Sequence, residues 1–324
     1  MTNLLSVKGL EVGYRMKRGL FQRGPASVVQ ALAGVDLDVA TGETLALVGE
    51  SGSGKSTLGR AMIRLVAPTA GTVHFRDTDI TALDRHRLRP LRRHFQIVFQ
   101  DPFGSLNPRM TVGQAIGETL RVHGLARGAA LDARVAECLE LVGLDPALAT
   151  RHPHAFSGGQ RQRIAIARAI ACGPAFIVAD EPLSALDMSL QGQIIDLFLD
   201  LKQRMGLTYL FISHDLNVVR WVADRVAVLY LGKLVELAPT AELYARPAHP
   251  YTRALLSAVP SPDPVAERAR VYTPLAGDPP SPANPPAGCR FHTRCPIAID
   301  RCRSIEPAFT EIAPGHFAAC HLAV

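Results

Sequence analysis

Three short apolar runs divide the first two thirds of the sequence. They are Leu45–Val48 before Gly49, Phe176–Ala179 before Asp180, and Tyr209–Ile212 before Ser213. Continuous apolar runs of this length indicate strands that are buried on both faces, as in a parallel sheet. Apolar residues at helical spacing follow the first two runs, at Leu58, Met62 and Leu65 and at Ile194, Leu197 and Leu201. The alternation predicts an α/β domain with functional groups at the carboxyl ends of its strands.

The segments around these runs have other patterns. Residues 1–45 resemble short strands, and Val35–Val39 alternates apolar and polar positions as a half-exposed strand does. The basic, glycine-containing stretch Arg15–Pro25 is interpreted as a loop. Residues from about 85 to 170 show mostly helical spacing, for example Leu131, Val135 and Cys138. They predict a helical subdomain inserted into the α/β core.

The last 84 residues differ in composition from the rest. They hold 14 of the 24 prolines. Such a density excludes long helices and central strands, because proline lacks the N–H that both require. The change predicts a domain boundary near residue 240, with domains at 1–240 and 241–324.

Composition and charge exclude several classes of protein. The chain has 324 residues, 48% of them hydrophobic and 20% charged, so a packed core is expected. A net charge of +6 suits contact with phosphates or an anionic membrane surface but is too small to indicate nucleic-acid binding. No apolar run approaches the length of a spanning helix, and the first residues lack a signal-peptide layout. A cytosolic chain is expected, in which cysteines serve as thiols or metal ligands rather than disulfides.

A glycine-rich stretch with the spacing of a phosphate-binding loop follows the first apolar run. Its residues fit the pattern GxxxxGK[ST] and are Gly49, Glu50, Ser51, Gly52, Ser53, Gly54, Lys55, Ser56 and Thr57. Glycines let the backbone N–H groups turn inward, where they form an anion site with the following helix start. Lys55 would contribute charge at the β and γ phosphates, and the Ser56 hydroxyl would ligate Mg²⁺. A plain surface turn is the alternative, but the flanking strand and helix favour a nucleotide site.

Two further stretches carry groups suited to nucleotide chemistry. Asp180 and Glu181 end an apolar strand, where the aspartate can complete a Mg²⁺ shell and Glu181 can act as the general base. A pair of solvated carboxylates is the alternative. Ser157 precedes two glycines at the start of a helical stretch. A serine N-cap followed by bare amides makes a second phosphate-binding helix start, or else an ordinary capped helix.

Six motifs in order resemble those of the ATP-binding subunits of ABC transporters. Two of them are the phosphate-binding loop and the Asp180–Glu181 pair described above. Phe156–Gln160 resembles the signature motif, with Phe156 where leucine is usual. Gln100 resembles the Q-loop glutamine, Ser184–Asp187 the D-loop, and His214 the switch histidine. The resemblance spans about residues 4–240. It implies a P-loop NTPase fold with a RecA-like core, an antiparallel β subdomain and the inserted helical subdomain.

The resemblance also implies how such a chain works. Two ATPase domains meet head to tail, so the signature residues Ser157, Gly158, Gly159 and Gln160 serve the partner's nucleotide. ATP and Mg²⁺ are the implied cofactors, with Mg²⁺ held by Ser56, Gln100 and Asp180. The implied catalytic residues are Glu181, His214 and Gln100. Tyr14 is expected to stack on adenine, and Phe21 is its rival.

Residues past 240 resemble the extension found in ATPases of dipeptide and oligopeptide importers. The matching stretches are Pro250–Leu256 and Pro279–His292, and the second ATPase subunit of such systems is the most similar type. The resemblance implies an ATP-hydrolysing subunit at the cytoplasmic face of the inner membrane. Its implied partners are two transmembrane permease subunits, a sister ATPase and an extracytoplasmic solute-binding protein, without nucleic acid. A nickel or glutathione importer shares much of this pattern.

Four of the six cysteines lie in the proline-rich region, at Cys289, Cys295, Cys302 and Cys320. The neighbouring arginines would favour thiolates and offset the charge of a cluster. They are Arg290, Arg294, Arg301 and Arg303. Four cysteines suit a [4Fe–4S] cluster, and some members of the resembled family carry one. Zinc is the rival, held by the four cysteines or with His292, His316 or His321 in place of one, and disulfides come third. Cys138 and Cys172 are expected to be small buried residues.

Two other classes of function compete with a transporter ATPase. A soluble ABC ATPase that acts on nucleic acid or ribosomes typically has tandem ATPase units, long coiled coils or zinc insertions, and this sequence shows none. The second competing class is a metal-sensing regulatory protein in which the cysteine-rich end is the functional part. ATP turnover that ignores cysteine replacement would argue against it.

Overall fold

The computed structural model describes residues 2–15, 28–260, 263–269, 275 and 277–323. They form two compact units. Unit 1 comprises described residues within 1–4, 40–44 and 82–212, and unit 2 those within 5–39, 45–81 and 213–324. The boundary expected at residue 240 stays a prediction, and unit 2 contains residues on both sides of it. In the described part of the chain, no helix is long and apolar enough to cross a membrane.

Unit 2 holds most of an antiparallel sheet with the strand order β2-β1-β4-β5. The strands are β1 (Asn3–Arg15), β2 (Val28–Ala40), β4 (Ala70–Phe75) and β5 (Thr78–Asp79). β4 pairs antiparallel with both β1 and β5. The strands expected within residues 1–45 supply β1 and β2 of this sheet, and both are longer than the short strands expected.

A second group of strands in unit 2 places the phosphate-binding loop. β3 (Thr44–Val48) is buried throughout and lies parallel to β9 (Arg225–Tyr230). β9, β10 (Lys233–Pro239), β12 (His316–Ala318) and β11 (Thr310–Ala313) then pair antiparallel in that order. The helices of unit 2 are α1 (Lys55–Met62), α8 (Leu216–Val222), α9 (Thr240–Ala245), α10 (Pro250–Ser257), α11 (Pro264–Ala269) and α12 (Asp300–Ser304). Where the structure describes the proline-rich end, its helices and strands are all short, as its composition predicts.

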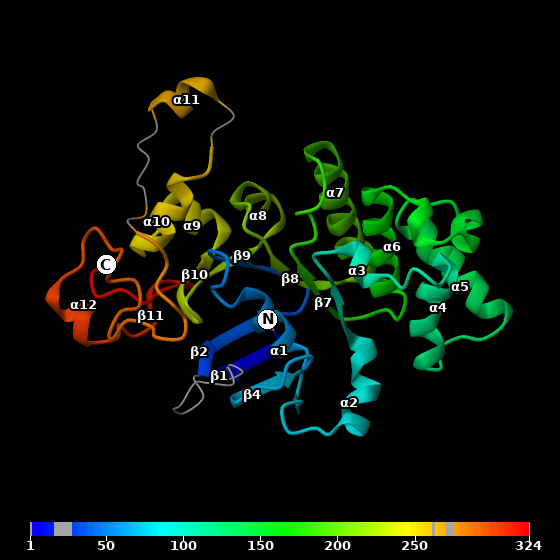
Figure 1. Cartoon of the computed structure of the whole chain (residues 1–324), viewed down its shortest axis with the longest axis horizontal. Coiled ribbons are helices and arrows are strands. Elements are labelled where there is room, and N and C mark those ends of the chain that lie inside the picture. Colours follow the sequence, from blue (N-terminus) through cyan, green and yellow to red (C-terminus); the bar gives the residue numbers. More distant parts are fainter. Residues whose placement is uncertain (1, 16–27, 261–262, 270–274, 276, 324) are drawn as a thin grey trace, which may run out of the picture. The chain divides into compact units, whose positions relative to one another are not determined.

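Unit 1 is built on the parallel strands β6 (Phe95–Val98), β7 (Phe176–Asp180) and β8 (Thr208–Ile212). Its α-helices are α2 (Arg85–Leu91), α3 (Pro102–Ser105), α4 (Val112–Val122), α5 (Ala129–Leu141), α6 (Gly158–Ile170) and α7 (Met188–Met205). Short 3₁₀ helices are η1 (Arg92–His94), η2 (Pro146–Thr150) and η3 (Pro153–Ala155). Figure 1 shows α4, α5 and α6 gathered as the green helical part. β6 lies inside the range expected to be helical, which corrects that expectation for residues 95–98.

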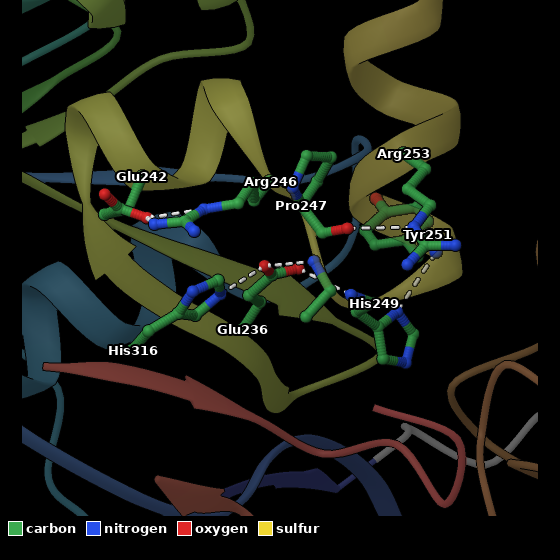
Figure 2. Close-up of polar contacts among 9 residues, drawn as sticks. Glu236, Glu242, Arg246, Pro247, His249, Tyr251, Arg253 and His316 are labelled. Carbon is green, nitrogen blue, oxygen red and sulfur yellow. Dashed lines mark hydrogen bonds and ion pairs between the residues drawn. The ribbon is translucent and has the colours of Figure 1, made fainter. Parts of the chain in front are cut away.

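The C-terminal region is anchored to β10 by a buried carboxylate (Figure 2). Glu236 is fully buried, and its oxygens accept hydrogen bonds from the backbone N–H groups of Ala248 at 2.7 Å and His249 at 2.9 Å. His316 on β12 donates from Nε2 to the same carboxylate at 2.8 Å. Three donors satisfy a charge that would otherwise be costly to bury. His316, a possible zinc ligand by sequence, is therefore committed to Glu236.

Candidate nucleotide-binding site

The turn after β3 has the backbone of an anion-binding loop. Gly49, Gly52 and Gly54 all adopt positive φ angles, of 148°, 78° and 107°. Gly54 is the N-cap residue of α1, whose first turn begins at Lys55. The strand, the turn and the helix start therefore follow one another as the sequence predicts. A helix start presents unpaired N–H groups and a positive dipole end, which favour phosphate.

Lys55 is buried against the loop that precedes it. Its side chain is 6% exposed, and Nζ donates to the carbonyl oxygens of Gly49 at 2.7 Å and Glu50 at 2.9 Å. The ammonium group is thus held at the mouth of the turn, where a bound phosphate would meet it. Ser51 and Gly52 are exposed, while Ser56 and Thr57 are half-buried. The described loop matches the phosphate site expected from the sequence, and phosphate binding itself stays a prediction.

Gly49 has no room for a side chain, and this gives a testable prediction. A Cβ at this position would lie 2.2 Å from the carbonyl oxygen of Leu229 on β9. We expect Gly49→Ala to lower the free energy of unfolding by about 3 kcal/mol, from steric overlap and backbone strain together. Urea unfolding of the full chain measures the change.

Gly34→Ala is the matched control for Gly49→Ala. Gly34 also has a positive φ, of 79°, but a Cβ there would meet nothing within 4 Å. Gly34→Ala should lower the free energy of unfolding by only about 1–2 kcal/mol, from backbone strain. Equal losses in the two variants would contradict the steric argument.

Unit 1 brings together two of the predicted catalytic residues. Gln100 follows β6, and its Nε2 donates to the Glu181 carboxylate at 3.0 Å. Glu181 follows β7 and has a φ of 49°, the left-handed region that is uncommon for a non-glycine residue. Strained backbone of this kind often marks functional positions. Asp180, the preceding residue, is 1% exposed at the end of β7.

The segment after Glu181 is held by local hydrogen bonds. The Glu181 backbone N–H donates to Ile212 at 3.0 Å, and the Ser184 hydroxyl donates to the Glu181 carbonyl at 3.0 Å. Asp187 caps α7 by accepting from the Leu190 N–H at 3.0 Å. A hydrogen bond from the Ser189 hydroxyl lowers the pKa of Asp187, so this carboxylate stays charged. The D-loop residues predicted from sequence therefore directly precede α7, and Asp187 is the N-cap of that helix.

The predicted signature residues form the start of α6. Ser157 is the N-cap, and its hydroxyl accepts from the Gln160 N–H at 3.3 Å. The Gln160 side chain accepts in return from the Ser157 N–H at 3.0 Å, which completes a capping box. Gly159 packs against Leu190, where a Cβ would lie 3.1 Å from a methyl carbon. Phe156, which stands where leucine is usual in this motif, is buried at 5% exposure.

The remaining nucleotide-site candidates are exposed. His214 lies at the surface of unit 2, directly before α8. The adjacent backbone is fixed, because the Ser213 N–H donates to Leu47 at 3.3 Å and Asp215 caps α8. Tyr14 is the next-to-last residue of β1 and is 45% exposed, so its ring is accessible for stacking. Its rival Phe21 lies outside the described residues.

The four cysteines of the C-terminal region are free thiols in one neighbourhood. Cys302 is buried, the other three are half-buried, and the Cys289 N–H donates to the Cys302 carbonyl at 2.8 Å. Burial raises the pKa of Cys289 to about 11, with smaller contributions from Cys302, Cys295 and Cys320. Burial raises the pKa of Cys295 as well.

These pKa shifts correct the expectation that nearby arginines favour thiolates. Arg294 pairs with Glu50 and Arg290 donates to the Leu231 carbonyl, so both cations serve other partners. Among the described residues, no three Cys, His, Asp or Glu side chains are arranged to hold one metal ion. Two of the histidines weighed as zinc ligands also make backbone contacts. His292 Nδ1 bonds to the Cys289 carbonyl and His321 Nε2 to the Ile305 carbonyl. Cys138 is buried as expected, and Cys172 is half-buried.

A buried strand, a glycine turn and a helix that begins with Lys55 define a P-loop nucleotide-binding protein. Residues 32–184 match the ABC transporter family. Residues 235–302 match the family described as oligopeptide/dipeptide transporter, C-terminal region. Both matches agree with the resemblance found in the sequence.

Two curated relatives match over nearly their whole length. A putative peptide import ATP-binding protein of Brucella ovis is 53% identical over 319 residues, which cover 98% of each chain. The oligopeptide transport ATP-binding protein AppF of Bacillus subtilis is 51% identical over 320 residues, which cover 98% of this chain and 97% of the relative. The chain belongs to the ABC transporter ATP-binding proteins, in the group with the oligopeptide/dipeptide transporter C-terminal region.

Solved structures share the fold. A dimeric ATP-binding cassette in a post-hydrolysis state, bound to ADP and Pi, matches with a TM-score of 0.64 and 32% identity. The match covers 73% of this chain and 98% of that cassette. The protein cbiO1 of Clostridium perfringens, part of an ABC transporter complex, matches with a TM-score of 0.65 and 27% identity over 76% of this chain and 92% of that chain. These matches confirm the predicted P-loop fold.

Sequence reasoning missed two residues that contact the phosphate-binding loop. The Glu50 N–H donates to the Tyr251 hydroxyl at 2.7 Å, and the Arg294 guanidinium pairs with the Glu50 carboxylate. Tyr251 belongs to a stretch that resembles the importer extension, and Arg294 stands out only as a cation beside cysteines. Neither carries a signal that points to residue 50.

Proposed function

We propose that this chain is the ATP-hydrolysing subunit of an importer of dipeptides or oligopeptides at the cytoplasmic face of the membrane. One observation carries the proposal above all. One chain contains a phosphate-binding loop with a buried lysine, a hydrogen-bonded Gln100–Glu181 pair and a match to the oligopeptide-transporter C-terminal region. Peptide import or oligopeptide transport is what the names of its relatives state, and their similarity extends over 98% of the chain.

The side chains suit hydrolysis without a covalent intermediate. Lys55 and the start of α1 would stabilise charge on the β and γ phosphates. Ser56, Asp180 and Gln100 supply oxygen ligands suited to Mg²⁺, which would neutralise phosphate charge when bound. Glu181 would orient the attacking water and accept its proton, and Gln100 would hold that carboxylate in place. His214 would contact the γ-phosphate.

The proposed working unit contains a second ATPase. One chain carries one phosphate loop and one signature helix, so Ser157, Gly158, Gly159 and Gln160 would serve nucleotide bound to the partner. ATP would close the dimer because its phosphates contact both subunits, and hydrolysis would open it. Two permease subunits would convert this closure into transport, and a solute-binding protein would deliver the peptide. A sister ATPase is the proposed partner, as in two-ATPase importers.

ATPase measurements with different partners test the proposal. The purified chain and its sister ATPase should hydrolyse Mg·ATP faster when reconstituted with permease subunits and peptide-loaded solute-binding protein. Stimulation by nucleic acid in place of these partners would reject the importer assignment in favour of a soluble ABC ATPase. Stimulation by nickel-loaded or glutathione-loaded binding protein, with no response to peptide, would change the substrate class.

We propose separately that Cys289, Cys295, Cys302 and Cys320 hold a [4Fe–4S] cluster, with zinc as the alternative. The support is the sequence pattern and the shared neighbourhood of the four thiols. The thiols would have to move together to bind the cluster, because the described residues show no three ligands arranged for one metal ion. The role would be structural, since a proline-rich segment needs a cross-link to stay folded. Binding would require the raised pKa of Cys289 to be overcome by the metal charge.

Metal analysis of anaerobically purified chain tests the cysteine proposal. We expect about four irons and four sulfides per chain and a broad absorption band at about 400 nm. Cys302→Ser should remove iron and lower thermal stability, whereas Cys138→Ser should retain iron. Zinc without iron would establish the alternative, and the absence of both metals would reject the proposal.

A further inference from the structure

Glu50, the second residue of the phosphate-binding loop, is gripped by the C-terminal region of the same unit. Arg294 donates from both terminal nitrogens to the two carboxylate oxygens, at 2.8 Å and 3.0 Å. The Tyr251 hydroxyl accepts the Glu50 backbone N–H at 2.7 Å. A bidentate pair of this kind fixes orientation as well as distance. Both the side chain and the backbone of Glu50 are therefore held from outside the loop.

Glu50 is also in direct contact with Lys55, the lysine of the loop. The Glu50 carbonyl accepts a hydrogen bond from Lys55 Nζ at 2.9 Å and another from the Ser53 N–H at 3.2 Å. Displacement of Glu50 would therefore move an oxygen that positions the Lys55 ammonium. Arg294, Glu50 and Lys55 form one chain of contacts between the C-terminal region and the phosphate site.

The charges in this chain of contacts also matter. A carboxylate within a phosphate-binding loop repels the nucleotide, and the repulsion is strong where water is scarce. The Glu50 side chain is 25% exposed and the Arg294 side chain 6% exposed, so solvent screens the pair only in part. Arg294 cancels the charge of Glu50 within the loop itself. Without this cation, Glu50 would oppose the phosphates that Lys55 attracts.

Tyr251 is itself firmly placed. Tyr251 is fully buried on α10, and its ring lies 4.7 Å from that of Tyr230 and 5.4 Å from that of Phe291. His249 is the N-cap of α10, and its Nδ1 accepts the Tyr251 N–H at 3.1 Å. Glu236 in turn holds the His249 N–H, as Figure 2 shows. The contact to the loop thus rests on a network that reaches back to β10.

The C-terminal region borders the loop at a second place. A cavity of about 200 Å³ is lined by Glu50, Ser51, Gly52 and Ser53 on one side and by Pro279–Pro282 on another. Proline has a fixed φ and little conformational freedom, so this segment forms a stiff wall. The C-terminal region therefore contacts the side chain of Glu50 and its backbone N–H, and it also borders the cavity beside the loop.

We propose that Arg294 and Tyr251 are positioning residues of the nucleotide site, through which the C-terminal region sets the affinity of the phosphate loop. The inference rests on the proposed ATPase function and deepens it. Arg294 neutralises Glu50 and Tyr251 fixes its backbone, so that Lys55 meets the phosphates in one arrangement.

Nucleotide binding by the full chain tests the role of Arg294. We expect Arg294→Met to weaken Mg·ADP binding, measured by titration calorimetry, about tenfold, with a similar rise in the KM for ATP and a smaller change in kcat. Adding Glu50→Gln to Arg294→Met should restore most of the affinity, because it removes the uncompensated charge. Arg294→Lys should lie between, since lysine keeps the charge but not the bidentate contact. Arg303→Met, at an exposed arginine of α12, is the matched control and should bind like the wild type.

Tyr251→Phe tests the second contact without opening the core. It removes only the acceptor of the Glu50 N–H and should weaken Mg·ADP binding about threefold with the fold intact. It also keeps the proposal testable if Arg294→Met does not fold. Unchanged affinity in both Arg294→Met and Tyr251→Phe would overturn the inference, as would a double variant weaker than Arg294→Met alone.

The control arm separates this inference from the proposed function. A wild-type chain that neither binds Mg·ADP nor hydrolyses ATP would reject the ATPase assignment itself. A wild-type chain that does both, with variants that match it, would reject only the role of the C-terminal region.

Discussion

Glu181→Gln should abolish ATP turnover while nucleotide binding persists. The amide keeps the shape of the side chain but cannot accept the proton of the attacking water, so we expect kcat to fall about 10²- to 10⁴-fold. Gln100 donates to this side chain at 3.0 Å and can still donate to an amide oxygen, so the local geometry should survive. ATP then remains between the two ATPase subunits. Size-exclusion chromatography with Mg·ATP should show a stable dimer.

Glu140→Gln is the control for this substitution. Glu140 is an exposed residue of α5 in the same unit, and its replacement should leave turnover unchanged. Full ATPase activity in Glu181→Gln would remove Glu181 from its proposed role as general base.

Lys55→Ala should abolish nucleotide binding rather than catalysis alone. The substitution removes the cation at the loop and also the two hydrogen bonds to Gly49 and Glu50. Each charge-assisted hydrogen bond that the ammonium group would donate to a phosphate oxygen contributes about 1.5–3 kcal/mol, so affinity for Mg·ATP should fall about 100-fold or more. Titration calorimetry with a slowly hydrolysed ATP analogue measures this directly.

Lys8→Ala controls for loss of a lysine elsewhere in unit 2. Lys8 is exposed and pairs with Asp38 at 3.4 Å, a surface contact of little energetic weight. It should bind nucleotide like the wild type. Retained affinity in Lys55→Ala would show that the glycine-rich turn is not the phosphate site.

The sequence predicts those parts of the fold in which local pattern and burial coincide. Every residue of β3, β7 and β8 is buried, so continuous apolar runs mark these strands clearly. The face of α7 that carries Ile194, Leu197 and Leu201 is likewise the buried one. The phosphate loop could be predicted because its glycines, lysine and helix start are contiguous in sequence.

β6 could not be predicted from its own residues. Phe95–Val98 is four residues long, follows an arginine-rich stretch and contains Gln96, so it lacks a continuous apolar pattern. It becomes a strand because it pairs in parallel with β7, a partner some eighty positions later in the chain. Pairing over such separations depends on tertiary structure rather than on local preference.

The contact between Arg294 and Glu50 shows the same limit at the candidate site. The two residues are 244 positions apart, and no periodicity or motif joins them. Sequence reasoning placed Arg294 with the cysteines because it stands beside Cys295. The fold instead turns its side chain to the phosphate loop, where it pairs with Glu50.

Coupled transport in reconstituted membranes tests the central claim most directly. Proteoliposomes would contain this chain with its sister ATPase and permease subunits, and solute-binding protein would be added with a labelled dipeptide or oligopeptide. The account predicts peptide uptake that requires ATP, accompanies ATP hydrolysis, and disappears with Glu181→Gln but not with Glu140→Gln. Uptake that continues with Glu181→Gln in place of the wild-type chain would contradict it.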